Sequence, residues 1–172
     1  YTDEITVQVA DVFSNVYGGF TESPDGIVEI RLPTRSTPIR FFLVGVTALS
    51  QLEHNAPPDD VGLEPLGLIY EVQPPGALFT KPATLRIRAP DAQALQDRSV
   101  SIYWYDWLAA RWVRCESEAD ETSRSFSARV TSFPKGRAFY GLFRDVAPPE
   151  SPRIEQHELT TDRIAILLSG TA

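Results

Sequence analysis

The chain has 172 residues, of which 42% are hydrophobic and 23% charged, values typical of a folded domain and unlike those of a disordered chain. Fourteen prolines and ten glycines are spread along its length and exclude long helices, so many short strands are favoured. A net charge of −7, with no run of Lys and Arg, disfavours a nucleic-acid partner, and no apolar run approaches the roughly 20 residues of a membrane span.

Apolar side chains alternate with a period of two residues in many short segments, which is the pattern of half-buried strands. In chain order the predicted strands are 5–9, 28–32, 39–43, 68–72, 85–87, 100–104, 111–114, 126–130 and 138–143. Turn residues at 23–26 and 73–76 separate some of them. This spacing predicts an all-β fold, a two-sheet antiparallel β-sandwich with Greek-key connections.

Helix is expected only at 91–96, where Asp91 follows a proline and is a suitable N-terminal cap. The segment 49–65 is long, acidic and proline-bearing, so we expect an external loop there.

A domain boundary is predicted near residue 144, so that 1–144 forms the sandwich domain. Residues 145–153 have the proline-rich composition of a stiff extended linker. Residues 154–172 are too few to form a core of their own and are interpreted as one or two strands, centred on Ile164, Ile166 and Leu168. Those side chains pair within a following immunoglobulin-like domain, pair back on the sandwich, or are donated to the sheet edge of another subunit, which would produce a filament.

The chain begins at Tyr1 and contains no methionine, as a processed chain or an excised fragment would. We therefore expect an exported protein, extracellular or on the cell surface. The single Cys115 cannot form an internal disulfide and cannot by itself hold a metal ion, so it is expected to be a small side chain near a strand end.

Several stretches resemble ZU5-type domains. The segment 18–26 and the strand after it are similar to the opening of that family, 67–72 and 75–87 to its middle, 102–106 and 111–113 to a hairpin, and 126–143 to its closing strands. The resemblance covers 18–143, the ZU5-like core. It implies a β-sandwich used for contact between proteins, as a module of larger receptors, scaffolds or bacterial surface proteins.

Some ZU5-type domains also cleave themselves within a His-Phe-Ser sequence. The matching positions here are Ser132, Phe133 and Pro134. A proline has no hydroxyl to act as nucleophile and a serine is no imidazole base, so we expect a degenerate site that does not cleave.

No catalytic, cofactor-binding or metal-ligating motif is found elsewhere. His54 and His157 have no second ligand at a suitable spacing, and no serine lies in a nucleophile motif. Acidic residues gather at 59–60 and 116–121 without the spacing of a calcium-binding loop, so we expect a charged hairpin tip, with a weak calcium site as the alternative. No enzyme activity, cofactor or metal ion is expected.

The densest feature is an aromatic cluster at 103–112. Alternation sends Tyr103 and Tyr105 to one face of a strand and Trp104 to the other. Trp104, Trp107 and Trp112 are the candidate binding residues, because exposed indoles stack on sugars and anchor protein interfaces.

The expected function is that of a non-catalytic structural or adhesive interaction module with a protein partner. The alternatives are a carbohydrate-binding module that uses exposed Trp and Tyr residues, a filament subunit that donates its C-terminal strand, and a degenerate self-cleaving domain.

Overall fold

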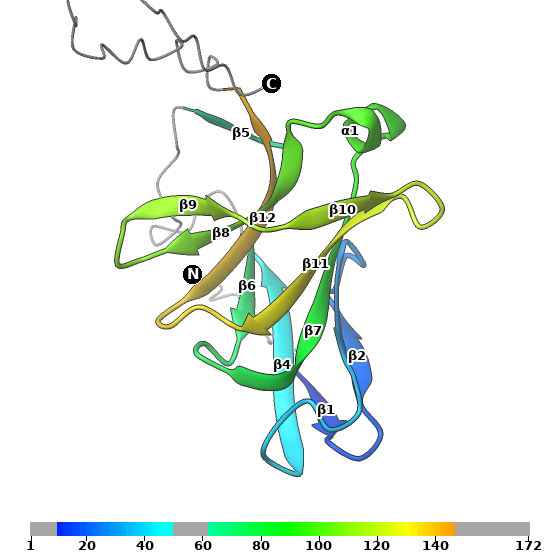
Figure 1. Cartoon of the computed structure of the whole chain (residues 1–172), viewed down its shortest axis with the longest axis vertical. Helices are drawn as coiled ribbons and strands as arrows, with labels where there is room; N and C mark the ends of the chain where they lie inside the picture. Colours follow the sequence, from blue (N-terminus) through cyan, green and yellow to red (C-terminus); the bar gives the residue numbers. More distant parts are fainter. Residues whose placement is uncertain (1–9, 50–61, 147–172) are drawn as a thin grey trace, which may run out of the picture.

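The computed structural model describes residues 10–49 and 62–146, and these form two antiparallel β-sheets that pack against each other (Figure 1). The all-β sandwich predicted from the sequence is confirmed. The elements are β1 (Ala10–Ser14), β2 (Gly19–Glu22), β3 (Val28–Leu32), β4 (Phe41–Ala48), β5 (Leu63–Pro65), β6 (Tyr70–Gln73), β7 (Leu78–Arg88), α1 (Ala92–Gln96), β8 (Val100–Asp106), β9 (Arg111–Arg114), β10 (Ser117–Asp120), β11 (Ser125–Ser132) and β12 (Ala138–Asp145).

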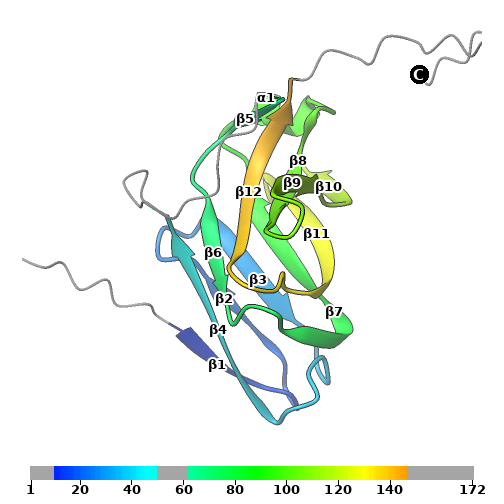
Figure 2. The ribbon, with the colours of Figure 1, turned by 90° about the vertical axis from the view of Figure 1, so that its left-hand side faces the viewer.

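One sheet has the strand order β1-β4-β6-β12-β8-β9, with β5 also pairing with β12, and the other has the order β10-β11-β7-β3-β2. Every pairing between these strands is antiparallel. The chain crosses between the sheets repeatedly, and β12 returns to lie between β6 and β8 in the first sheet (Figure 2). Neighbours in each sheet therefore come from distant parts of the sequence.

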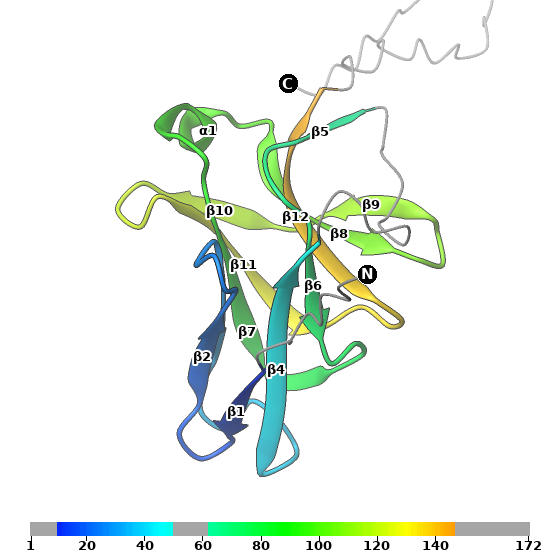
Figure 3. The ribbon, with the colours of Figure 1, turned by 180° about the vertical axis from the view of Figure 1, so that it is seen from behind.

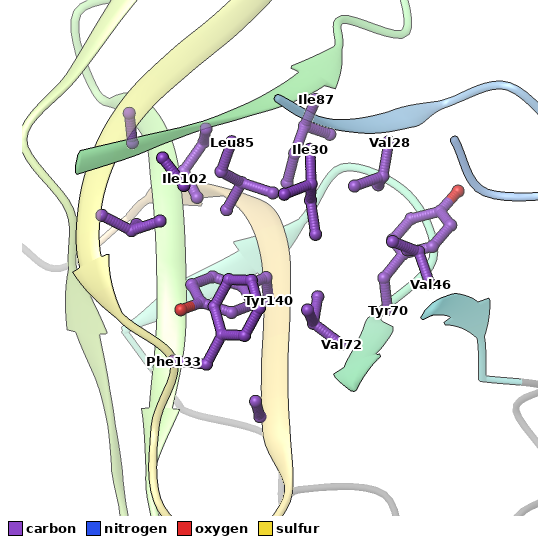
Figure 4. Close-up of a cluster of buried hydrophobic side chains, with 14 of the residues drawn as sticks. Val28, Ile30, Val46, Tyr70, Val72, Leu85, Ile87, Ile102, Phe133 and Tyr140 are labelled. Atoms are coloured by element: carbon purple, nitrogen blue, oxygen red, sulfur yellow. The ribbon is translucent and has the colours of Figure 1, made fainter. Parts of the chain in front are cut away.

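The main core lies between the two sheets. Val28 and Ile30 of β3 and Leu85 of β7 in the second sheet, and Ile102 of β8 in the first, are all fully buried. Figure 4 shows them gathered with the rings of Tyr70 and Tyr140. Burying each such side chain contributes roughly 1.5–3 kcal/mol, so this layer supplies most of the hydrophobic stabilisation.

The first sheet carries a second core on its outer face. Tyr103 and Tyr105 of β8, Trp112 of β9 and Phe139 and Phe143 of β12 form this outer cluster with Leu49, while Leu63 and Ile69 pack against it. The external loop predicted at 49–65 thus contributes β5 and a hydrophobic cover to the sheet.

Two local predictions from the sequence are confirmed. Helix α1 is capped by Asp91, whose carboxylate accepts a hydrogen bond from the amide of Ala94 at 2.8 Å. The reversal at 23–26 closes with a hydrogen bond from Gly26 N to Ser23 O at 2.8 Å, and the glycine has a φ of 67°, a value that L side chains rarely adopt.

The predicted strand 39–43 overlaps β4, but the side chains expected to face the core face water. Ile39, Phe41 and Leu43 are exposed, and the buried residues of β4 are Val44 and Val46. The run Phe41–Val46 has apolar residues in both phases, so alternation alone does not say which side faces the core. Figure 3 shows β4 next to the edge strand β1, where Leu43 lies opposite the exposed Val12.

Four strands were not predicted, namely β1, β2, β5 and β10. They are short, and β10 (Ser117–Asp120) has no large apolar side chain. The predicted linker begins at 145, but Asp145 still belongs to β12. The rest of the linker from 147, the predicted strand 5–9, the strand residues Ile164, Ile166 and Leu168, both histidines and the acidic pair 59–60 lie outside the described residues. Within the described part, no helix has the length and hydrophobicity needed to cross a membrane.

Candidate functional site

The three tryptophans of the aromatic cluster do not form a common surface. Trp112 is only 7% exposed, because its ring packs in the outer cluster with centroids 4.5 Å from Phe143 and 5.4 Å from Tyr105. Its expected role as an exposed binding residue is therefore corrected to a packing role. Trp104 is partly buried against the main core, and Trp107, in the turn after β8, keeps 41% of its surface exposed.

Trp104 and Trp107 meet the other candidate residues, Ser132, Phe133 and Pro134, in one hollow of about 590 Å³. We call this hollow the tryptophan groove. It lies between the β8–β9 turn, the β11–β12 loop and the start of β7. Its lining residues are Gly76, Leu78, Trp104, Asp106, Trp107, Leu108, Ser132, Phe133, Pro134, Lys135 and Gly136.

The groove is mainly apolar and its rim is unusually exposed. Leu108 is 97% exposed and Leu78 is 70% exposed, and both lie beside Trp107 in the lining. Single exposed leucines are ordinary, but three large apolar side chains around one groove form a patch of the kind that marks an interaction site.

Trp107 is held in a fixed position. Its indole Nε1 donates a hydrogen bond to the carbonyl of Arg137 at 2.7 Å, and its ring meets Tyr105 edge-on at a centroid distance of 4.8 Å. The guanidinium of Arg137 lies 4.6 Å from the centroid of the Phe139 ring and forms an ion pair with the buried Glu71 at 2.7 Å. These contacts reduce the entropy that the ring would lose on binding a ligand.

The loops that frame the groove are fixed by their own hydrogen bonds. Phe133 N donates to Ala77 O, and Gly76 N donates to Pro134 O, each at 2.8 Å, so the β11–β12 loop is tied to the start of β7. In the β8–β9 turn, the Asp106 carboxylate accepts a hydrogen bond from Leu108 N at 2.9 Å. The groove is therefore preorganised on three anchored segments.

A second hollow, of about 350 Å³, adjoins the groove and shares Trp104, Ser132 and Pro134 with it. We call it the polar pocket. Its lining residues are Trp104, Cys115, Glu116, Arg129, Val130, Thr131, Ser132, Pro134 and Tyr140. Burial raises the pKa of the Cys115 thiol to about 12, so the thiol is protonated at neutral pH and is a poor nucleophile.

The positions compared with a self-cleavage sequence, 132–134, are structural parts of this region. Phe133 is buried between the sheets, with ring centroids 4.9 Å from Phe79 and 6.4 Å from Tyr140 (Figure 4). Ser132 ends β11, and Pro134 accepts the hydrogen bond from Gly76. The residues that line the two hollows include no histidine, so Ser132 has no imidazole base among them.

Of the acidic residues at 116–121, Glu116 precedes β10, Glu118 and Asp120 lie in β10, and Glu121 lies in the turn that follows it. The Asp120 carboxylate accepts hydrogen bonds from Thr122 N at 2.9 Å and Ser123 Oγ at 2.7 Å, which lower its pKa, the Ser123 side chain most strongly. The described residues contain no group of three or more His, Cys, Asp or Glu side chains that could hold a metal ion.

Sequence reasoning missed Leu78 and Leu108. A signal for Leu108 was present, because the turn 107–110 reads Trp-Leu-Ala-Ala where hairpin turns favour Gly, Asn and Asp. Apolar side chains in an exposed turn are unfavourable in water, so their presence is a reason to expect a surface that binds a partner.

The sequence comparisons assign no relative to this chain: no protein-family model and no curated protein matches it.

Proposed function

We propose that this chain is a non-catalytic protein-interaction module of an exported or cell-surface protein, and that it binds its partner through the tryptophan groove. The observation that carries the proposal is the gathering of Leu78, Trp107 and Leu108 around one apolar hollow on anchored loops. Fixed, exposed tryptophan and leucine side chains are typical anchors of a binding surface, since burying them releases water at little cost in entropy. The resemblance of 18–143 to ZU5-type domains favours the same function.

The chemistry of the groove favours binding over catalysis. Of the side chains that line it, only Asp106 and Lys135 carry a charge, and the carboxylate of Asp106 is engaged in holding the β8–β9 turn. A reaction would need a nucleophile and a base within hydrogen-bond reach of each other, and the lining offers the Ser132 hydroxyl without a histidine beside it.

A peptide-display selection tests the proposal. We expect a random peptide library to yield sequences with large apolar side chains that bind the protein, and the variant Leu108→Asp to bind them at least tenfold more weakly, because a carboxylate would be desolvated in the apolar groove. The matched control is Val12→Asp, which alters another exposed apolar side chain, on β1. Equal binding by all three proteins, with unchanged melting temperatures, would contradict the proposal.

Carbohydrate binding is a second candidate, favoured by one observation. The half-exposed Trp107 ring is immobilised beside a pocket that offers the Tyr140 hydroxyl and the charged groups of Glu116 and Arg129. A flat, fixed indole stacks on a sugar ring, and charged side chains bind neighbouring hydroxyls. Titrating polysaccharides against tryptophan fluorescence checks this: binding that is lost in Trp107→Ala supports it, and an unchanged spectrum eliminates it.

A further inference from the structure

Beside the polar pocket, a stretch of strand edge in the second sheet has no hydrogen-bonded neighbour among the described strands. Strand β10 pairs only with residues 125–128 of β11, and no strand of the described part continues that pairing along 129–132. The other edge of β11 pairs with β7. Backbone amide and carbonyl groups along an open edge can pair with an added strand.

The two hollows follow this open edge in order. Residues 129–132 line the polar pocket, and 132–136 line the tryptophan groove, with Trp104 as a wall of both. An extended segment lying along β11 would therefore pass from polar to apolar surroundings if it ran parallel to β11, and from apolar to polar if it ran antiparallel.

Tyr140 lines the polar pocket from the core side. The residue is 1% exposed. A tyrosine hydroxyl can donate a hydrogen bond to a ligand. Burial raises the pKa of Tyr140, so the hydroxyl remains protonated and able to donate over the physiological pH range.

The chain contains a segment of matching chemistry. Residues 164–172, Ile-Ala-Ile-Leu-Leu-Ser-Gly-Thr-Ala, carry no charged side chain in a protein of net charge −7, and the lining of the hollows carries two acidic and two basic residues, so it is nearly neutral. The segment is apolar through Leu168 and then has hydroxyls at Ser169 and Thr171. An antiparallel strand would place its apolar half over the tryptophan groove and its hydroxyl half at the polar pocket.

We propose that residues 164–171 of one copy add as an antiparallel strand to the edge of β11 at 129–132 in a second copy. The proposal rests on the proposed function of the groove as a protein-binding site. Donation between copies is favoured because β12 runs away from the β11–β12 loop and ends at the top of the view in Figure 2, and the prolines at 148, 149 and 152 favour an extended spacer. Such a head-to-tail contact does not close on itself and yields a filament.

Two complementary variants test the donation. Ile166→Asp damages the donated segment, and Leu108→Asp damages the acceptor groove. By light scattering, we expect the unaltered chain to gain mass with concentration and each variant to remain at the monomer mass of 19.1 kDa. A mixture of the two variants should form dimers, because the intact segment of Leu108→Asp can occupy the intact groove of Ile166→Asp. Assembly should end there, because the remaining segment and the remaining groove of that dimer are the damaged ones. The control Val12→Asp should assemble as the unaltered chain does.

A synthetic peptide of residues 163–171 provides a direct measurement. It should bind the Ile166→Asp protein and change its Trp107 fluorescence, and should bind Leu108→Asp at least tenfold more weakly. A monomeric unaltered chain at high concentration, or assembly that survives both substitutions, overturns the proposal. If library peptides still bind the groove while this peptide does not, the donation is wrong and the proposed function stands. If Leu108→Asp changes neither the binding of library peptides nor the binding of this peptide, the donation and the proposed function are both wrong.

Discussion

At the scale of single residues, one glycine in the lining of the groove sets the position of the Trp107 ring. Gly136 has a φ of 84° and precedes Arg137, whose carbonyl accepts the hydrogen bond from the Trp107 indole. Only glycine adopts this conformation without strain, so the position of the ring is set by a backbone that another residue would resist.

The substitution Gly136→Ala should lower the free energy of unfolding by about 1–2 kcal/mol, the cost of a left-handed conformation for an L residue. The added methyl group itself has room, because its nearest contact would be Trp107 Cδ1 at 3.7 Å. Urea denaturation measures the change. Gly67→Ala, at an exposed position where a methyl group meets nothing within 4 Å, is the matched control and should be neutral within about 0.5 kcal/mol. Equal effects at both positions would refute the strain argument.

Asp97 makes stability depend on pH. Hydrogen bonds from the Ser99 side chain and amide, and then from Arg144, lower its pKa below the ordinary value of 3.8. Because the native state favours the ionised form, this contribution is complete well above the unfolded pKa of 3.8 and is lost as the pH falls through the lower native pKa. Asp97→Asn should therefore reduce the urea midpoint at pH 7 and flatten its decrease between pH 4 and pH 2. A variant whose midpoint keeps the full acid dependence would show that other carboxylates are responsible.

At the scale of elements, an apolar residue stabilises the fold only if its side chain faces the core, and β4 and β7 provide a contrasting pair. Leu43 on β4 and Leu85 on β7 are equally hydrophobic, but the first faces water and the second is fully buried. Leu85→Ala should cost about 2–5 kcal/mol through lost burial and a cavity, whereas Leu43→Ala should change stability by less than about 1 kcal/mol. Chemical denaturation of the two variants separates them, and a large loss for Leu43→Ala would mean that another surface covers this face.

The same contrast shows how far the sequence predicts the structure. Where only one phase is apolar, as in Val28, Ile30 and Leu32 of β3, both strand and buried face were predicted correctly. Where both phases are apolar, as in β4, the strand was predicted and its face was not. β10 lacks an apolar pattern because one of its edges and much of its surface lie in water, so no periodicity reveals it.

The candidate site was predictable in part for a related reason. The density of aromatic residues indicated Trp104 and Trp107 as candidates, and the family resemblance indicated 132–134. Nothing in the sequence indicates that the β8–β9 turn and the β11–β12 loop lie next to each other. Their proximity follows from β12 pairing with β8 after the chain has passed through the other sheet. Contacts of that kind are set by topology.

At the scale of the whole molecule, the chain should remain covalently intact. The resemblance to ZU5-type domains would place the nucleophile and the base of self-cleavage at Pro134 and Ser132, whose side chains supply neither, and Phe133 is buried in the core. A freshly purified sample should give one band on a denaturing gel. Two bands that together account for a split near Phe133 would contradict this expectation.

The position of β12 has a consequence for how the protein is made. This strand pairs with β6 on one edge and β8 on the other, and it contributes Tyr140 to the main core and Phe139 to the outer cluster. It is also the last of the described strands to leave the ribosome. Until residue 145 has emerged, β6 and β8 have no common neighbour, and both aromatic layers are open to water. Folding of this domain during synthesis should therefore be abrupt and late. Nascent chains arrested before Ala138 clears the exit tunnel should be digested readily by protease, and those in which β12 is fully exposed should resist it.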